Sequence, residues 1–569
     1  MRKKISWQLQ HRFPVTSVAA FQQVLLANRG WQKADLHREW QIDTLTSEQL
    51  GLDEQQVASA VKRISHAHKH KEKVVIFGDY DVDGNCATAI MWRTLREIGL
   101  IATPFIPHRL KHGYGMSVQA LEDIMREQKP DLIITVDNGI TAKQALEFCQ
   151  QHGIDVIVTD HHQADGQVVP AVAVVATRQL SGAGVAWWLS YQLLTQFKPK
   201  QASALAQDLL DLVALATIVD QVPLVGWNRH IVSAGINQLR HSQRAGIVAL
   251  TRQAHAKQEQ LTTQDIGFGL GPRINAIGRL TNTLEALRLL CTDKPFQAQR
   301  LATSLTDVNQ QRQTLTSEMV ELALAQVDEK TLPKVIVVAS PEFHEGIIGL
   351  IASKLVDRYY RPALVIGIGK DIAKGSARSI TGLNITDLLR ECRELLLDVG
   401  GHAAAAGCSL LPANIEALQK MMTQKADKLL RDDDLQPRLI IETPVTIELL
   451  KDAACLSLLE ALEPCGNGNP PPVVQIEGRV QHCQMMGAEK QHLKIYVGDS
   501  RQSLSVLFWH YGDKDITVPA LGSKIKVAGR LTIDNWQQRE IVMIGEDWQA
   551  CRTRKNKSAG RPPENRRKE

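Results

Sequence analysis

The sequence predicts an α/β protein: a parallel-sheet domain, then a smaller α/β domain, then a C-terminal β-barrel. Three observations carry this. Short apolar runs, typical of buried parallel strands, alternate with helical stretches up to about residue 220. The same rhythm starts again at Lys334. From Val473 to Trp548, short alternating stretches separated by turn residues are typical of a small barrel.

The length of 569 residues is too great for one core and predicts three or four domains. No apolar run approaches the ~20 residues of a membrane span, and the first residues lack the apolar core of a signal peptide. Nine cysteines without a C-x-x-C pair argue against a zinc site or a disulfide framework. We therefore expect a cytoplasmic protein with reduced thiols and no membrane segment.

The elements follow in order along the chain. Residues 1–45 form a leader that we expect to be helical and to pack onto the main body. The first domain, residues 46–300, is expected to hold strands at 74–77, 132–136 and 154–159 and helices at 54–69, 84–98 and 141–151. A polar helix without Gly or Pro, Leu301–Asp328, connects the lobes within residues 301–330.

The second α/β domain spans residues 331–432, and the barrel spans residues 440–550. Aromatic residues of the barrel are candidates for stacking on bases, although most are expected in its core: Tyr496, Phe508, Trp509, Trp536 and Trp548.

Residues 551–569 form a basic tail that we expect to be disordered. Its part from Arg552 to Glu569 has eight basic and two acidic residues, a net charge of +6, whereas the whole chain has +5. Two interpretations stay open for this tail: sequence-independent attraction to nucleic acid, or a solvated chain end.

Four acidic stretches are the candidates for the functional site. The first three follow the apolar runs, so their side chains are expected at the carboxyl edge of the sheet, where ligands bind in open α/β sheets. They are Asp79-Tyr80-Asp81-Val82-Asp83-Gly84, Val136-Asp137-Asn138-Gly139, Asp160-His161-His162, and Asp220. Six carboxylates gathered there would repel one another, and hard divalent cations would relieve that repulsion. The pattern indicates a two-metal phosphoesterase site.

Two simpler interpretations of these acids are less favoured. Each aspartate taken alone could be a helix cap or a turn residue, but caps at all four motifs would be an unusual coincidence. A calcium loop needs a glutamate six residues after Gly84, and Ile90 stands there instead.

The motif Asp160-His161-His162 resembles the signature of the DHH phosphoesterase superfamily. Gly400-Gly401-His402-Ala403-Ala404-Ala405-Ala406-Gly407 resembles the end of that superfamily's associated substrate-binding domain. The stretches from Asp211 to Asp220 and from Gly267 to Leu280 resemble the bacterial RecJ exonucleases, and the similarity runs from about residue 20 to 550 with an OB-fold-like end. It implies degradation of single-stranded DNA from the 5′ end with Mg²⁺ or Mn²⁺.

The resemblance also implies roles for individual residues. The implied metal ligands are Asp81, Asp83, Asp137, His161 and Asp220, with Asp137 as the bridging carboxylate and Asp79 as a further ligand or an orienting group. His162 would hydrogen-bond the site or the scissile phosphate. A donor set of carboxylates with one imidazole suits two Mn²⁺ or Mg²⁺ ions.

Polar residues in glycine-rich stretches are the candidates for binding the DNA strand. They are Arg109, His112, Arg273, Asn275, Arg279, His344, Ser376, Arg378 and His402. We expect Arg273, Asn275 and Arg279 in a loop, and Gly400-Gly401 to form an anion-binding nest before His402. For His344 a helix cap on the segment from Gly346 to Tyr359 is the alternative. The segment 176–184 is shorter than the family pattern.

The predicted function is a single-stranded-DNA-specific 5′–3′ exonuclease of DNA repair and recombination. The alternatives are a DHH phosphodiesterase of cyclic dinucleotides or short oligoribonucleotides, and a non-catalytic nucleic-acid-binding scaffold. Family resemblance further implies a monomer that works with a single-stranded-DNA-binding protein and a RecQ-type helicase.

Overall fold

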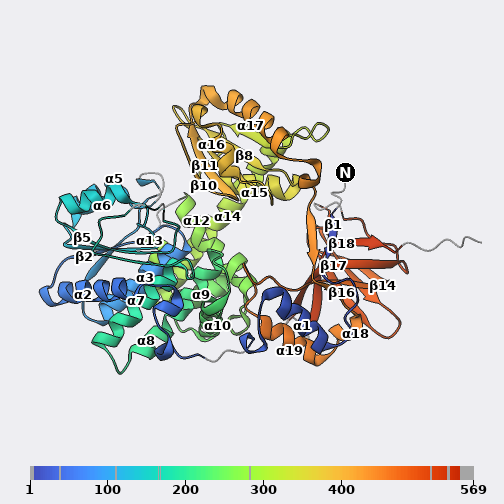
Figure 1. Ribbon diagram of the computed structural model, residues 1–569, viewed down its shortest axis with the longest axis horizontal. Coiled ribbons are helices and arrows are strands. Elements are labelled where there is room, and N and C mark those ends of the chain that lie inside the picture. The colour runs from blue at the N-terminus through green and yellow to red at the C-terminus, as the bar shows by residue number, and fades with distance from the viewer. Residues whose placement is uncertain are drawn as a thin grey trace, which may run out of the picture. The chain divides into compact units, whose positions relative to one another are not determined.

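A computed structural model of the chain describes residues 5–36, 40–108, 112–113, 115–164, 166, 168–280, 284–487, 489–512, 516–534 and 539–551 (Figure 1). The chain divides into two compact units. One comprises Met1–Gln32, Gln436–Ala461 and Pro471–Glu569; the other comprises Lys33–Leu435 and Leu462–Pro470. The predicted basic tail lies outside the described residues apart from Cys551.

The larger unit begins with a five-stranded sheet in the order β3-β2-β4-β5-β6, in which every pairing is parallel. The strands are β2 (Val74–Phe77), β3 (Ala102–Phe105), β4 (Leu132–Val136), β5 (Asp155–Asp160) and β6 (Ala173–Ala176). β2 and β4 are buried along their whole length, as expected for strands covered on both faces. The predicted parallel sheet is confirmed.

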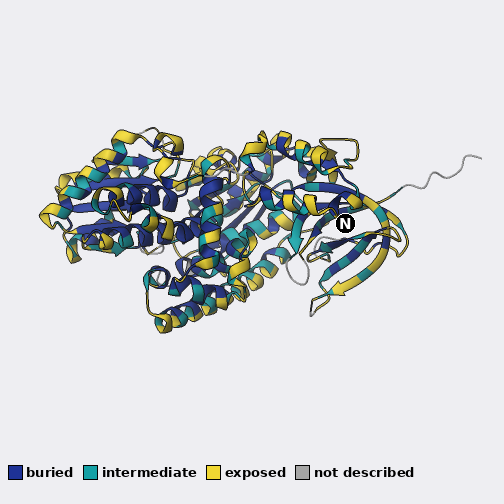
Figure 2. Cartoon of the chain, turned by 90° about the horizontal axis from the view of Figure 1, so that it is seen from below, coloured by how far each residue is buried: buried dark blue, intermediate teal, exposed yellow. Residues whose placement is uncertain are grey.

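Successive residues of each strand face opposite sides of this sheet, which gives it two cores. Ile76, Ile134 and Ile157 pack with one set of helices: α2 (Glu54–His70), α3 (Val82–Glu97) and α7 (Gly182–Phe197). Val75, Ile133 and others pack with α5 (Val118–Glu127) and α6 (Lys143–Gln151) on the other face (Figure 1). Figure 2 shows the same pattern, with buried strands and helices exposed on their outer faces.

A helical region follows the sheet. Its elements are α8 (Ala202–Asp208), α9 (Leu210–Val219), α10 (Gly226–His241), α11 (Ala245–Gln253), η5 (Asp265–Leu270), α12 (Gly271–Leu280), α13 (Leu284–Cys291) and α14 (Pro295–Ala325). In the described part of the chain, the one helical stretch long and apolar enough to cross a membrane is Ala202–Val219, and 61% of it is buried in this core. Burial of that kind is typical of a core helix.

The expectation of a loop around Arg273 and Asn275 is wrong. The segment is helical: η5 is a π-helix that runs directly into α12. Pro272, the second residue of α12, follows the π-helical turn directly, so the helix continues through a residue that has no N–H to donate. The glycines serve close packing instead of loop flexibility, since a Cβ on Gly271 would lie 2.4 Å from Val219 of α9.

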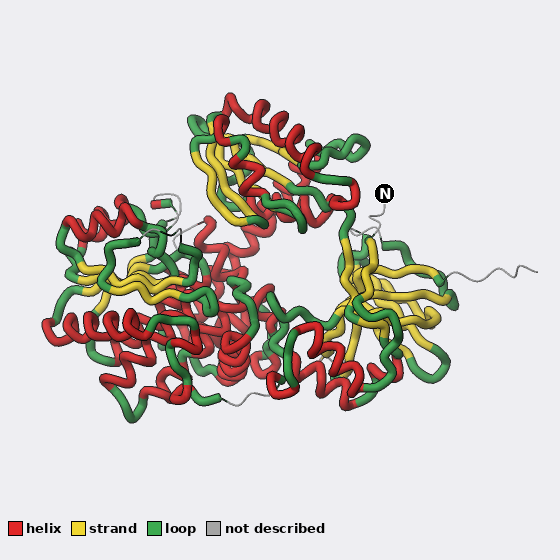
Figure 3. The backbone as a smooth tube through the Cα atoms, in the orientation of Figure 1, coloured by secondary structure: helices red, strands yellow, loops and turns green. Residues whose placement is uncertain are grey.

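The second lobe has a mixed sheet in the order β10-β11-β9-β8-β7 (Figure 3). Its strands are β7 (Ile336–Ser340), β8 (Ala363–Ile368), β9 (Ala373–Arg378), β10 (Asp398–His402) and β11 (Ala405–Leu410). Its helices are α15 (Ile348–Tyr359), α16 (Ile385–Arg390) and α17 (Ile415–Leu429). α14 packs with both lobes of the unit: Leu301 and Leu305 pack with the first lobe, and Ala323 packs with α15 of the second.

The predicted anion nest at Gly400-Gly401 is also wrong. Both glycines lie in β10, which pairs antiparallel with β11, so Gly400 stands opposite Gly407 and Gly401 opposite Ala406. Gly401 has a φ of +142°, and a Cβ there would lie 2.4 Å from the carbonyl oxygen of Ala405. Glycine is therefore required for the close approach of two strands.

The smaller unit is a closed β-barrel, because β14 pairs with both β15 and β17 in the order β14-β15-β16-β18-β17. Its strands are β14 (Val473–Met486), β15 (His492–Gly498), β16 (Ser503–Phe508), β17 (Lys524–Asp534) and β18 (Glu540–Ala550), and the short strand β13 (Thr443–Pro444) pairs with β14. The helices α18 (Ile447–Leu450) and α19 (Ala453–Leu462) lie between β13 and β14 in the sequence. Phe508 is fully buried and its neighbour Trp509 is 42% exposed. Trp536 lies outside the described residues.

The prediction that the leader packs onto the main body is wrong for its first 32 residues, which belong to the smaller unit. β1 (Ser6–Leu9) pairs in parallel with β12 (Arg438–Ile441), and Trp7 donates a hydrogen bond to Asp547 of the barrel at 2.9 Å. Arg29, at the end of α1 (Val18–Arg29), forms an ion pair with Glu442 at 2.8 Å. These partners are more than 400 residues away in the sequence, so no local pattern reveals them.

Candidate metal centre

Six side chains meet at the carboxyl ends of β2, β4 and β5 and at the end of α9. They are Asp79, Asp81, Asp83, Asp137, His161 and Asp220. Ligand atoms form three overlapping groups, each within 4.8 Å: Asp79 with Asp81 and Asp137, Asp83 with His161 and Asp220, and Asp137 with His161 and His162. His161 joins the groups, since its Nε2 lies 3.1 Å from Asp137 and 3.6 Å from both Asp83 and Asp220.

Backbone hydrogen bonds at helix N-termini orient two of the carboxylates. Asp81 is the N-cap of α3 and accepts a hydrogen bond from the backbone N–H of Gly84 at 2.9 Å. Asp83 points across to α7, where its two oxygens accept the N–H groups of Gly182 and Ala183 at 2.7 Å each. These two amides open the first turn of α7, which favours a negative charge.

Asp137 is held in an unusual backbone conformation. Its φ is +62°, a left-handed value that Asp and Asn tolerate better than other side chains. Gly182 packs against it so closely that a Cβ would lie 2.5 Å from Asp137 Oδ1. The sequence analysis did not place Gly182 in the site. The signal that could have identified it is the glycine-spaced stretch from Ser181 to Gly184.

Two buried carboxylate oxygens in the cluster have no hydrogen-bond partner among the described residues: Asp79 Oδ2 and Asp137 Oδ1. His161 Nε2 approaches the latter, but without hydrogen-bond geometry. A buried oxygen without a partner is costly, and a cation would satisfy it. A set of carboxylate oxygens with one imidazole suits Mn²⁺ or Mg²⁺, so these residues fit the predicted ions.

Burial, together with the charges of neighbouring carboxylates, makes these acids hard to ionise. Burial, followed by the charge of Asp81, raises the pKa of Asp79 to about 8. Burial and the charge of Asp83 raise the pKa of Asp137 well above its ordinary value. Asp220 has a side chain that is 32% exposed, yet desolvation within the cluster and the charge of Asp83 raise its pKa to about 8.

We expect the free energy of unfolding of the metal-free protein to fall as the pH rises from about 4 towards 8. In the unfolded chain an aspartate loses its proton near pH ~4, whereas the buried Asp79 keeps it until about 8. In that window the unfolded state binds fewer protons, so raising the pH favours unfolding. Asp137 adds to the effect in the same direction.

Thermal melts in EDTA at about pH 5.5 and 8 measure this, with Asp137→Asn as the variant that should reduce the slope. Mn²⁺ should raise the melting temperature more at the higher pH, because it binds the deprotonated carboxylates. A metal-free protein that becomes more stable from pH ~5.5 to ~8 would contradict the crowded-carboxylate description.

Asp160 orients His162 at the edge of the cluster. Its Oδ1 lies 2.7 Å from His162 Nδ1, and its other oxygen accepts the N–H of Ile140 at 2.9 Å. Burial by itself would lower the pKa of His162, but the hydrogen bond and the charge of Asp160 outweigh it and raise that pKa to about 9. Asp160 belongs to the recognised motif, yet the sequence did not mark it as a positioning residue.

Several residues that the sequence predicts to bind DNA instead make hydrogen bonds within the protein. His112 uses both ring nitrogens, one towards Asp123 at 3.1 Å and one towards the N–H of His108 at 3.0 Å. Arg273 donates to the backbone oxygens of Gly269 and Gln253. Arg109 and the side chain of Arg279 lie outside the described residues.

Asn275 holds the loop that carries three acids of the cluster. Its side-chain oxygen accepts the N–H of Val82, between Asp81 and Asp83, at 3.1 Å. Three residues later, Gly278 lies so close to the backbone oxygen of Tyr80 that a Cβ would approach it to 2.7 Å. α12 therefore buttresses the loop that carries Asp79, Asp81 and Asp83.

The predicted DNA-binding residues of the second lobe are not part of the acidic cluster. Arg378 donates to Ser376 at 3.2 Å and to the backbone oxygen of Ala377 at 2.8 Å. His344 accepts the N–H of Gly346 at 3.0 Å in the turn before α15, whose N-cap is Ile347 without a side-chain hydrogen bond, so the alternative of a helix cap is wrong for His344. His402 is exposed at the end of β10.

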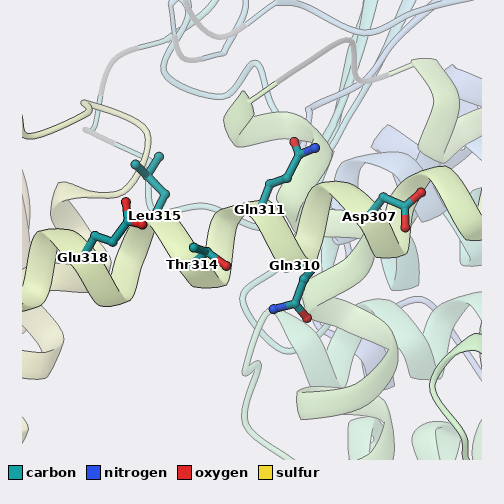
Figure 4. Close-up of a pocket in the computed structure, with 6 residues that line it drawn as sticks. All are labelled: Asp307, Gln310, Gln311, Thr314, Leu315 and Glu318. Carbon is teal, nitrogen blue, oxygen red and sulfur yellow. The ribbon is translucent and has the colours of Figure 1, made fainter.

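A separate surface depression lies on α14 (Figure 4). It is lined by Asp307, Gln310, Gln311, Thr314, Leu315 and Glu318. All six come from one helix, and none of the carboxylates of the metal centre is among them.

Three family models match the chain. Residues 73–217 match the "DHH family, N-terminal domain", residues 332–428 match the "DHHA1 domain", and residues 441–544 match the "RecJ OB domain". They account for the sheet with the acidic cluster, the second lobe and the barrel.

Curated relatives carry the name single-stranded-DNA-specific exonuclease RecJ. The protein of Bacillus subtilis is 36% identical over 84% of this chain, which spans 62% of that relative's length. The protein of Haemophilus influenzae is 32% identical over 77% of this chain and 80% of its own length.

Among solved structures, RecJ of Thermus thermophilus in complex with Mn²⁺ superimposes with a TM-score of 0.80 at 28% identity, covering 97% of this chain and 81% of that one. The complex of the same protein with Mg²⁺ gives a TM-score of 0.74. The predicted family, its α/β fold and its barrel are thus confirmed. The chain belongs to the RecJ family of single-stranded-DNA-specific exonucleases.

Proposed function

We propose that this chain hydrolyses single-stranded DNA from the 5′ end, with two Mn²⁺ or Mg²⁺ ions held by Asp79, Asp81, Asp83, Asp137, His161 and Asp220. The observation that carries the proposal is the buried cluster itself, in which Asp79 Oδ2 and Asp137 Oδ1 have no hydrogen-bond partner among the described residues. The Mn²⁺ and Mg²⁺ complexes of the Thermus thermophilus relative support the choice of ions.

When bound, the ions would activate the attacking water and offset the charge that develops on the phosphate. The chain's own residues hold the geometry. The amides of Gly182 and Ala183 fix Asp83, and Gly182 fixes Asp137. Asp160 fixes the ring of His162 through its Nδ1, which leaves the other ring nitrogen able to donate a hydrogen bond to the scissile phosphate.

Strands labelled separately at the 5′ and 3′ ends test the proposal. With Mn²⁺, the 5′ label should appear at once as a mononucleotide, whereas the 3′-labelled strand should shorten progressively. EDTA should abolish both results. Release of the 3′ label first would reverse the proposed polarity, and preferential cleavage of a cyclic dinucleotide or a short oligoribonucleotide would favour the alternative phosphodiesterase.

Blunt duplex is expected to be a poor substrate. The relatives are named as specific for single strands, and aromatic and backbone contacts to a strand need unpaired bases. Matched strands, tested alone and annealed, should differ in initial rate by about tenfold or more, and adding a helicase should restore the rate on duplex. Equal rates on both would contradict single-strand specificity.

We also propose, from the family resemblance alone, a place in DNA repair and recombination and cooperation with a single-stranded-DNA-binding protein and a RecQ-type helicase. A monomeric state and the strand-holding roles of Arg109, Arg279, Ser376, Arg378 and His402 belong to the same proposal.

A further inference from the structure

Phe268 is a large apolar side chain that the fold places in water. It is 85% exposed, while Ile266 and Leu270, two residues away on either side, are fully buried. The core therefore holds the opposite side of η5, and Phe268 points away from it. Exposing an aromatic ring forgoes the stabilisation that its burial would bring.

The residues beside Phe268 leave its ring uncovered. Gly267 and Gly269 carry no side chains. Gly267 lies near Ile218 of α9, and Gly269 lies near Ala254 at the end of α11. The backbone here is π-helical, a rare conformation that is frequent at functional sites. The glycines let η5 pack against its neighbours, and the phenyl ring of Phe268 stays exposed.

The segment that carries Phe268 packs against residues next to those of the acidic cluster. A Cβ on Gly271 would touch Val219, the residue before Asp220. Further along the same helix, Asn275 accepts the N–H of Val82, between Asp81 and Asp83. Phe268 thus stands on a segment that is anchored to residues next to the metal-binding ones.

We propose that Phe268 is a stacking platform for a nucleobase of the strand that lies in the metal centre. This inference rests on the proposed function. An exonuclease must hold each successive nucleotide whatever its base, and stacking on a phenyl ring is tolerant of sequence because every base has a π-face. Gly267 lies near Ile218 and Gly271 packs against Val219, the two residues before Asp220, so the segment that carries Phe268 borders the end of α9 that bears part of the cluster.

Binding without metal gives a readout independent of cleavage. Affinity for a 3′-labelled oligonucleotide is measured in EDTA for the wild type, Phe268→Ala, Phe268→Trp and Phe296→Ala. Phe296 is the matched control, since it is 86% exposed at the start of α14. Phe268→Ala should weaken binding about tenfold, Phe268→Trp should retain it, and Phe296→Ala should match the wild type.

Strands with one abasic site, moved stepwise from the 5′ end, locate the contact. At one position, loss of the base should weaken wild-type binding by about the same factor, and Phe268→Ala should show no further loss there. In turnover with Mn²⁺, the variant should raise KM and leave kcat nearly unchanged.

The inference is overturned if Phe268→Ala binds the intact strand like the wild type, or if its effect adds to that of every abasic site. It is also overturned if the variant changes only the oligomeric state in sedimentation, since the ring would then cover a second copy. If the wild-type protein neither binds nor degrades single strands, the proposed function itself fails, and the two failures are distinct.

Discussion

Replacing Asp137 by Asn should reduce turnover on single-stranded DNA at least about a thousandfold, the effect of losing ~4 kcal/mol of transition-state stabilisation. Asp137 belongs to the acidic group with Asp79 and Asp81 and also approaches His161. An amide would remove the charge that holds the ions and keep the shape. Asn is chosen because it tolerates the φ of +62° that alanine would strain.

The measurement is the initial rate with saturating substrate and Mn²⁺. In EDTA at neutral pH the variant should melt no lower than the wild type, because it removes a crowded carboxylate. Asp155→Asn is the control at the opposite end of β5, where Asp155 pairs with Arg63 at 2.6 Å. Near wild-type hydrolysis by Asp137→Asn in clean Mn²⁺ buffer would refute the assignment of Asp137 as a metal ligand.

Gly182→Ala should weaken Mn²⁺ binding about 10- to 100-fold, the usual effect of disturbing groups that orient metal ligands. The added methyl would lie 2.5 Å from both Cβ and Oδ1 of Asp137, so the carboxylate must move. The same change disturbs the first turn of α7, whose amides hold Asp83. Turnover should fall with the occupancy of the site and recover in part at high Mn²⁺.

Titration calorimetry with Mn²⁺ gives the affinity directly, and thermal melts in EDTA give the stability. Gly184→Ala is the matched control in the same turn, because its methyl would meet the side chain of Leu180 and no metal-binding residue. Both variants gain the same helix propensity. Equal Mn²⁺ affinities for the two variants would show that Gly182 does not position the site.

Much of the metal centre follows from local sequence. Apolar runs followed by Asp79, Asp137 and His161 are enough to predict parallel strands with their functional ends at one edge, because parallel strands must point the same way. The family motifs then assign roles to Asp81, Asp83 and Asp220. Binary patterning over Val473–Trp548 likewise predicts the barrel, since alternation with period two fits only strands.

Other features were decided by contacts between distant segments. Gly182 touches Asp137, and Asn275 holds Val82, yet neither pair is near in sequence. The glycines around Pro272 suggest a loop, but their missing side chains let α12 approach α9 and the loop at Tyr80, and that packing stabilises a helix.

The first 32 residues show the same limit most clearly. β1 has few residues and little burial, and its hydrogen-bond partners in β12 lie more than 400 positions away. Local sequence by itself determined the strands and the polar groups at their ends, because these depend on periodicity and on the residues that follow each apolar run. The tertiary structure decided which side chains orient those groups and where the leader packs, because close approach and strand pairing depend on partners that the local sequence does not contain.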